Sequence, residues 1–148
     1  MPSTHTSLHY HLVFSTKDRL PLIRPDIRDR VHAYLGGVVR GMGGVPLEVG
    51  GVADHVHLLI GLKPTHVLAD VLRTLKTDSS KWMHAEVGAS DFGWHDGYGA
   101  FTVSKSALPD AGEYVRTQDA HHRHRTFQEE YVELLEEMAI AYDSRYLW

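Results

Sequence analysis

Residues 8–15, with the sequence LHYHLVFS, alternate strictly between two sets of side chains, and this alternation limits the possible folds more than any other feature of the chain. Successive side chains on a strand point to opposite faces, so the pattern predicts a strand with one well-buried face. The buried set is apolar and consists of Leu8, Tyr10, Leu12 and Phe14. Other elements must cover this apolar face, and their order along the chain indicates the fold class.

Helical and strand-like spacings of apolar residues follow one another along the rest of the chain, separated by turns that contain glycine and proline. They predict helices at about 25–42, 64–87, 108–121 and 127–142, and strands at 45–52, 55–62 and 100–104. The first six elements follow the split β-α-β order of ferredoxin-like, or RRM-like, domains. We therefore expect an α+β fold. An antiparallel sheet should carry helices on one face, leave its other face available for a ligand or partner, and be followed by C-terminal helices.

The chain has 148 residues, a length that suits a single compact domain over residues 1–148 with a core at about 8–122. Its hydrophobic and charged fractions, 43% and 23%, are those of an ordinary globular protein. The absence of cysteine excludes disulfide scaffolds, thiolate zinc sites, iron–sulfur clusters and cysteine nucleophiles. The sequence shows no signal peptide and no apolar run of membrane-spanning length, so we expect a soluble, cytoplasmic protein.

The net charge of −4 is concentrated at the C-terminal end. Residues 126–148 hold six acidic residues against a single arginine, which leaves 14 basic and 13 acidic residues in residues 1–125. We interpret residues 126–148 as an acidic helical tail. The remainder is nearly neutral and has local basic clusters, so a phosphate-binding face is compatible with the composition.

Histidine is the most unusual feature of the composition, with 12 residues, and two of them form the motif His55-Val56-His57 within an apolar segment. On a strand both imidazoles lie on one face, close enough to chelate a divalent cation, while Val56 faces the core. Two other His-x-His motifs occur, at 9–11 and 122–124, so the spacing alone does not establish a metal site. Histidines at the surface, or hydrogen-bonded in the core, are the alternative.

The predicted helix 108–121 places Tyr114 and Gln118 one turn apart on the same face. A cation held by two imidazoles and the Gln118 carboxamide oxygen would keep open positions for a phosphate oxygen, and the phenol could reach that phosphorus. Together these residues indicate phosphoryl transfer with a tyrosine nucleophile, in which a cation acts as Lewis acid and template. A half-buried helix tyrosine and a solvent-facing glutamine are the alternative for these two residues.

With these residues, the chain resembles the TnpA-type single-tyrosine transposases of the HUH nuclease superfamily. These are IS200-like transposases of insertion sequences that move as single-stranded DNA. Collinear blocks over about residues 8–131 carry the resemblance: YHLVFSTK at 10–17 with Arg19; DHVHLLI at 54–60; Leu75-Lys76 with Ser79 and Ser80; GYGAFTVS at 97–104; then Tyr114, Gln118, His121-His122 and Phe127-x-x-Glu130-Tyr131.

The resemblance implies that His55, His57 and Gln118 are ligands of Mg²⁺ or Mn²⁺ and that Tyr114 is the nucleophile. Attack on a DNA phosphate would give a 5′-phosphotyrosine and a free 3′-hydroxyl, and a 3′-hydroxyl could later attack this link and rejoin strands. The implied substrate is single-stranded DNA with hairpins, the implied assembly is a homodimer, and no nucleotide cofactor is needed. The tyrosine helix could complete the site of its own subunit or that of its partner.

Basic and aromatic residues outside the catalytic set indicate a path for DNA. The DNA-binding candidates are Lys17, Arg19, Arg73, Lys76, Lys81 and Tyr98. A solvated surface is the alternative for each charged residue. Ala53 departs from the Met-Pro-Asp that relatives often carry before the histidine pair, which affects that turn and none of the four catalytic positions.

Two other functions are compatible with the same residues. The chain could be a non-catalytic nucleic-acid-binding module with structural histidines, whose affinity would fall with salt but would not respond to a chelator. It could also be a domesticated REP-associated tyrosine transposase that acts on chromosomal palindromes.

Overall fold

The computed structural model describes residues 3–148, and its centre is a four-stranded sheet in the order β2-β3-β1-β4. The strands are β1 (His9–Ser15), β2 (Val45–Val52), β3 (His55–Gly61) and β4 (Gly99–Thr102). All neighbouring strands pair antiparallel, with β1 between β3 and β4. This order confirms the predicted split β-α-β arrangement and the α+β class.

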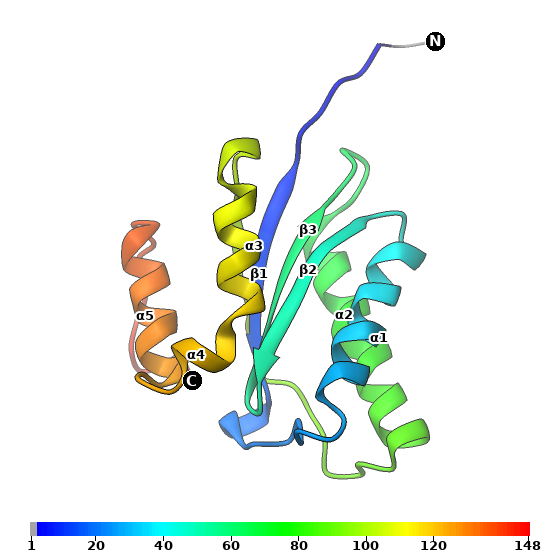
Figure 1. Cartoon of the computed structure of the whole chain (residues 1–148), viewed down its shortest axis with the longest axis vertical. Coiled ribbons are helices and arrows are strands. Elements are labelled where there is room, and N and C mark those ends of the chain that lie inside the picture. The colour runs from blue at the N-terminus through cyan, green and yellow to red at the C-terminus, as the bar shows by residue number, and fades with distance from the viewer. Residues whose placement is uncertain (1–2) are drawn as a thin grey trace.

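Two helices cover one face of the sheet, α1 (Arg28–Gly41) and α2 (Leu68–Trp82), and both lie to the right of the sheet in Figure 1. A π-helical turn, Met83–Val87, extends α2, and short 3-10 turns occupy Lys17–Arg19 and Lys105–Ala107. The predicted strand alternation is confirmed, because Leu12 and Phe14 of β1 share a buried cluster with Val56 and Leu58 of β3. The main core therefore lies between the sheet and these two helices.

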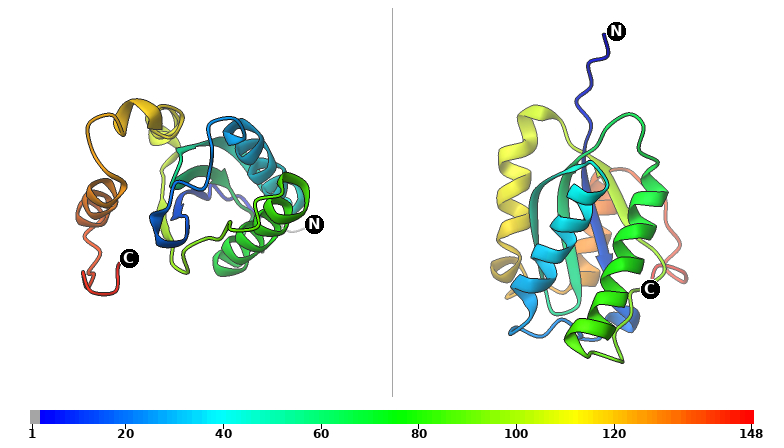
Figure 2. Two further views of the ribbon diagram at one scale, coloured as in Figure 1. Left: turned by 90° about the horizontal axis from the view of Figure 1, so that it is seen from below. Right: turned by 90° about the vertical axis from the view of Figure 1, so that its right-hand side faces the viewer.

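The opposite face of the sheet is covered by the C-terminal helices, so the expectation that it is open is wrong. Helices α3 (Leu108–Arg116), α4 (Gln118–His121) and α5 (Phe127–Glu137) lie on this side, as the left view of Figure 2 shows. A second, smaller core forms there, in which Val13 and Phe101 of the sheet pack with Phe127 and Leu135 of α5. The acidic segment is therefore amphipathic, and its apolar side chains help to hold it on the sheet.

Helix boundaries differ from the predicted ones for local reasons. Helix α2 begins at Leu68, later than expected, because the ring of His66 hydrogen-bonds to two backbone groups and holds the preceding segment as a turn. The helix predicted over 108–121 breaks at Thr117, whose φ of −104° and ψ of 30° leave the helical range. Helix α5 ends at Glu137 because Ala139 takes a φ of 53°. None of the helices formed by residues 3–148 has the length and apolarity that crossing a membrane requires.

Helix α3 approaches strand β2 so closely that only glycine fits at the contact. A Cβ added to Gly50 would lie 1.9 Å from the backbone carbonyl oxygen of Val115. Real Cβ atoms do not come this near to backbone oxygen, so the missing side chain of Gly50 sets the depth at which α3 lies against the sheet.

Candidate active site

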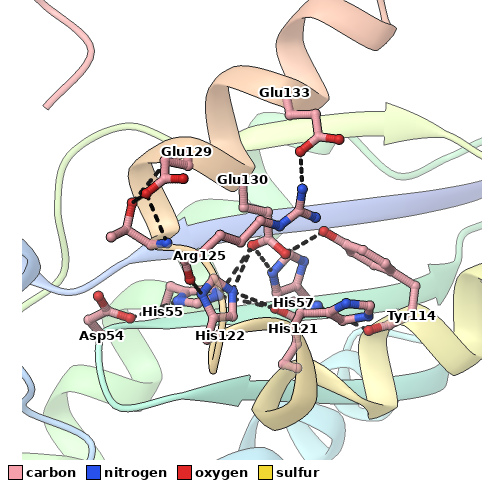
Figure 3. Close-up of polar contacts among 12 residues, drawn as sticks. Asp54, His55, His57, Tyr114, His121, His122, Arg125, Glu129, Glu130 and Glu133 are labelled. Carbon is pink, nitrogen blue, oxygen red and sulfur yellow. Dashed lines mark hydrogen bonds and ion pairs between the residues drawn. The ribbon is translucent and has the colours of Figure 1, made fainter.

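Two buried histidines on β3 form the base of a polar cluster on the second face of the sheet (Figure 3). The side chains of His55 and His57 are 0% exposed, and their ring centroids lie 5.0 Å apart. Both rings point away from the main core, which confirms that the strand period places them on one face. A surface location for this pair is excluded.

Tyr114, near the end of α3, and Gln118, at the start of α4, reach the same cluster. The side-chain Nε2 of Gln118 donates to the backbone carbonyl oxygen of Tyr114 at 3.0 Å, so its Oε1 faces the imidazoles and lies 3.3 Å from His55 Nε2. The Tyr114 ring meets the His57 ring nearly at right angles, with centroids 5.7 Å apart. The structure thus brings together the four residues that the sequence analysis selected.

Glu130 of α5 lies at the centre of this cluster, although the sequence analysis gave it no role. Its side chain is fully buried. One carboxylate oxygen, Oε1, lies 2.9 Å from His57 Nε2 and 3.2 Å from His122 Nε2, and the other, Oε2, accepts a hydrogen bond from the Tyr114 hydroxyl. The potential ligand atoms of His55, His57, His122 and Glu130 all lie within 4.8 Å of one another, so these residues could hold a metal ion.

The position of Glu130 follows from the start and the period of α5. Thr126 and Glu129 form a capping box that begins this helix. Phe127, Glu130 and Leu134 then follow at helical spacing on the side that faces the sheet. This spacing is present in the sequence, but the acidic composition of the segment favoured a helical tail outside the core. His122 and Glu130 lie in the motif blocks given above without a role assigned to them.

Each of the three imidazoles uses its Nδ1 for a further contact that fixes the ring. For His55, His57 and His122 the partners are, in order, Asp54 Oδ1 at 2.7 Å, His11 Nε2 at 2.7 Å and the Arg125 carbonyl oxygen at 2.9 Å. Contacts of this kind orient imidazoles in metal sites and leave Nε2 directed at the centre.

Burial and hydrogen bonding act on the pKa values of the imidazoles in opposite directions. Burial lowers the pKa of His57 to about 4 and that of His11 to about 3, so both rings are neutral at pH 7. Burial acts in the same direction on His55, but hydrogen bonds to Asp54 and Glu130 outweigh it and raise the pKa above its ordinary value. The cluster therefore holds one imidazole whose pKa is lowered, His57, and one whose pKa is raised, His55.

The carboxylate and the phenol also have shifted pKa values. Burial opposes ionisation of Glu130, but its contacts with the surrounding imidazoles outweigh burial and hold its pKa far below the usual range. Burial and the hydrogen bond to this carboxylate both raise the pKa of the Tyr114 hydroxyl. Tyr114 therefore keeps its proton at neutral pH.

Lys76, one of the DNA-binding candidates, anchors a loop instead. Its Nζ donates to the backbone carbonyl oxygens of His95, Asp96 and Gly97 at 2.8, 3.2 and 2.7 Å. Burial lowers the pKa of this ammonium to about 8. These bonds give Lys76 a structural role, and its contact with DNA phosphate stays a prediction.

The other DNA-binding candidates fall on two surfaces. Arg73, Lys81 and Tyr98 line a groove of about 620 Å³ between α2 and the loop after it. Lys17 and Arg19 lie in the 3-10 turn after β1, where the Arg19 guanidinium lies 5.3 Å from the centroid of the Trp148 ring. Their contacts with DNA stay predictions.

Comparison with known proteins identifies the class. A family model described as an IS200-like transposase matches residues 4–118. The protein is therefore a DNA transposase. Within this class, the chain belongs to the IS200-like transposase family.

Relatives in sequence and structure agree with this assignment. The chain is 26% identical over 119 residues to the ISDra2 transposase TnpA of Deinococcus radiodurans, across 75% of this chain and 84% of the relative. A crystal structure of a protein assigned as a transposase from Deinococcus radiodurans R1 is 25% identical, with a TM-score of 0.64 over 80% of this chain and 95% of that one. A REP-associated tyrosine transposase bound to a REP hairpin is similar in fold, with 11% identity and a TM-score of 0.53 over 78% of this chain and 70% of that one.

Proposed function

We propose that this transposase cleaves and rejoins single-stranded DNA at hairpin-flanked ends through a 5′-phosphotyrosine link to Tyr114. The observation that carries the proposal is that the Tyr114 phenol meets the buried pair His55 and His57 in one cluster. A phenol beside cation-binding imidazoles is the arrangement needed for nucleophilic attack on a phosphate. The relative bound to a REP hairpin supports hairpin DNA as the substrate class.

In this proposal His55, His57 and Gln118 hold Mg²⁺ or Mn²⁺. The donor set fits a cation, because Asp54 engages Nδ1 of His55 while Nε2 faces the carboxamide oxygen of Gln118. A bound divalent cation neutralises charge on the phosphate and orients its oxygens. Imidazole ligands favour Mn²⁺ over Mg²⁺.

Tyr114 supplies the oxygen that attacks. Its Oη forms a bond to the DNA phosphorus while the bond from that phosphorus to the 3′ oxygen breaks. The phenol gives up one proton and the departing 3′ oxygen takes up one, so neither water nor ATP enters the reaction. One phosphodiester replaces another, and a 3′-hydroxyl can therefore reverse the step on the same or a different strand.

Arg73 and Lys81 would contact phosphates of the strand, and Tyr98, which is 40% exposed, offers a ring for stacking on a base. These contacts position a strand without reading its sequence. A homodimer is the proposed assembly, and sedimentation equilibrium on the free protein measures it directly.

The test is the formation of a covalent adduct. Purified protein is incubated with single-stranded hairpin oligonucleotides and Mn²⁺, and intact mass spectrometry detects attached nucleotides. We expect an adduct with the wild type and none with Tyr114→Phe, while Tyr142→Phe, which removes an exposed hydroxyl bonded to Glu136, should behave as the wild type. An adduct that persists in Tyr114→Phe would overturn the assignment. Hairpin binding that weakens with salt, ignores a chelator and never yields an adduct would identify a non-catalytic module instead.

A further inference from the structure

Glu130 and His122 have no part in the ligand set proposed above, yet they lie in the same cluster. We propose that both are ligands of the same cation, so that the segment after α3 supplies three of five ligands, Gln118, His122 and Glu130, and links the metal centre to the nucleophile. The link to the nucleophile rests on the proposed function of Tyr114, whereas the metal binding does not. Both residues lie beyond residue 118, where the match to the family model ends.

The hydrogen-bond partners of His122 favour a bound cation. Its Nδ1 lies 2.9 Å from the backbone carbonyl oxygen of Arg125, and because a carbonyl only accepts, Nδ1 carries the hydrogen. In the neutral ring, Nε2 then presents a lone pair. This atom lies 3.0 Å from Gln118 Oε1 and 3.2 Å from Glu130 Oε1, which are also acceptors. One proton can satisfy only one such pair, whereas a cation between the three atoms satisfies them all.

His55 repeats this pattern on the strand side of the cluster. Its Nδ1 faces the Asp54 carboxylate at 2.7 Å, and its Nε2 lies 3.3 Å from Gln118 Oε1 and 3.4 Å from Glu130 Oε1. His57 Nε2 lies 2.9 Å from the same Glu130 oxygen. Glu130 Oε1 is therefore the atom on which all three Nε2 atoms converge.

The distances from Glu130 Oε1 to the three imidazole nitrogens fit those between ligand atoms of one cation. Ligand atoms bonded to one cation at about 2.1 Å lie about 3.0 Å apart at neighbouring octahedral positions and about 3.4 Å apart at tetrahedral ones. The distances from Glu130 Oε1 to the three imidazole nitrogens run from 2.9 to 3.4 Å. Glu130 Oε1 could therefore share a cation with each of these imidazoles.

The buried charge of Glu130 also favours a bound cation. Its carboxylate is fully buried, and the ion pairs recorded for it within residues 3–148 are with histidines, not with lysine or arginine. A buried carboxylate needs strong compensation, which a divalent cation supplies. Because Oε2 holds the Tyr114 hydroxyl, the same side chain would join the cation to the attacking group.

The donor set also predicts which ions bind. Three imidazoles, one carboxylate and the Gln118 carboxamide favour Mn²⁺, Co²⁺ or Zn²⁺, whereas Mg²⁺ prefers a sphere of oxygens and waters. We expect the free protein to bind Mn²⁺ at least tenfold more tightly than Mg²⁺.

The experiment measures Mn²⁺ binding to the full chain without DNA, by electron paramagnetic resonance of the free ion. Glu130→Gln and His122→Asn should each weaken binding by about tenfold to a hundredfold, as expected for groups that ligate or orient a metal. The matched controls are Glu136→Gln on the exposed side of α5 and His124→Asn, both of which should bind as the wild type. With Co²⁺ in place of Mn²⁺, loss of the His122 nitrogen should change the visible absorption spectrum.

Wild-type Mn²⁺ affinity in folded Glu130→Gln or folded His122→Asn would overturn the inference for that residue, as would a wild-type protein that binds no Mn²⁺. If one variant fails to fold, as judged by circular dichroism, the other and the Co²⁺ spectrum decide. The Tyr114→Phe variant keeps the two proposals separate. It should still bind Mn²⁺ while forming no adduct, so a failure of the nucleophile and a failure of the ligand set give different results.

Discussion

Replacing Gly50 with alanine should push α3 away from the sheet and misplace the tyrosine. The added Cβ would lie 1.9 Å from the Val115 carbonyl oxygen, so the backbone must move by about 1.1 Å to reach the 3.0 Å below which real Cβ contacts are essentially never seen. Overpacking of this kind costs about 1–3 kcal/mol of folding free energy. Tyr114 directly precedes Val115, and a displacement of about 1 Å at a catalytic group lowers the rate about a hundredfold.

Thermal unfolding followed by circular dichroism measures the first effect, and the rate of adduct formation under single-turnover conditions measures the second. Gly37→Ala is the matched control, because its Cβ would meet nothing within 4 Å. In the interior of α1 this change should stabilise the protein by about 0.5–1 kcal/mol and leave the adduct rate unchanged. If Gly50→Ala unfolds and reacts as the wild type does, α3 does not rest on β2 as described.

Three further predictions concern the loop anchor, the groove beside α2 and a partly buried histidine. Lys76→Met leaves three loop carbonyl oxygens without their donor and should lower stability by about 1–3 kcal/mol, while Lys81→Met at an exposed position should not. Equal melting temperatures for the two variants would show that Lys76 does not anchor the loop. The double variant Arg73→Ala and Lys81→Ala should weaken hairpin binding and reduce the slope of log affinity against log salt by about 1.4, since each phosphate contact on a single strand contributes about 0.7; an unchanged slope would place the DNA elsewhere. Burial lowers the pKa of His32 in the folded state. Below about pH 6.5 the unfolded chain therefore takes up a proton that the folded state resists. The wild type should lose stability relative to His32→Gln as the pH falls from about 6.5. Parallel pH profiles of the free energy of unfolding for the wild type and this variant, measured with urea, would contradict the lowered pKa of His32.

The sheet and the first helix layer were predictable because the period of the side chains carries the information. The period of two in β1 and β3 determines which side chains enter the main core, and glycine and proline mark the turns between elements. The packing of α5 on the second face of the sheet was not predicted, because the prediction for 126–148 rested on its charge and not on the apolar side of the helix. The break at Thr117 was also missed, since no glycine or proline marks it.

The candidate site likewise contains residues that local spacing groups and residues that meet only in the folded chain. His55 and His57 are neighbours on one strand, and Tyr114 and Gln118 are one helical turn apart, so local spacing was enough to group each pair. Glu130 meets them only because α5 folds back over the sheet, and no local spacing reports a contact between residues so far apart in the chain. An alternating strand with a histidine at position 11 carried a weak signal for the contact with His57, which the structure now shows.

The covalent link to Tyr114 is tested most directly by locating the nucleotide on the protein. Wild-type protein is allowed to react with a single-stranded hairpin oligonucleotide and Mn²⁺, digested with nuclease and protease, and the modified peptide is sequenced by mass spectrometry. The proposed mechanism requires a phosphonucleotide on Tyr114, absent when a chelator is added before the DNA. A nucleotide on Tyr131 or another residue, or DNA cleavage that leaves no nucleotide on the protein, would contradict it.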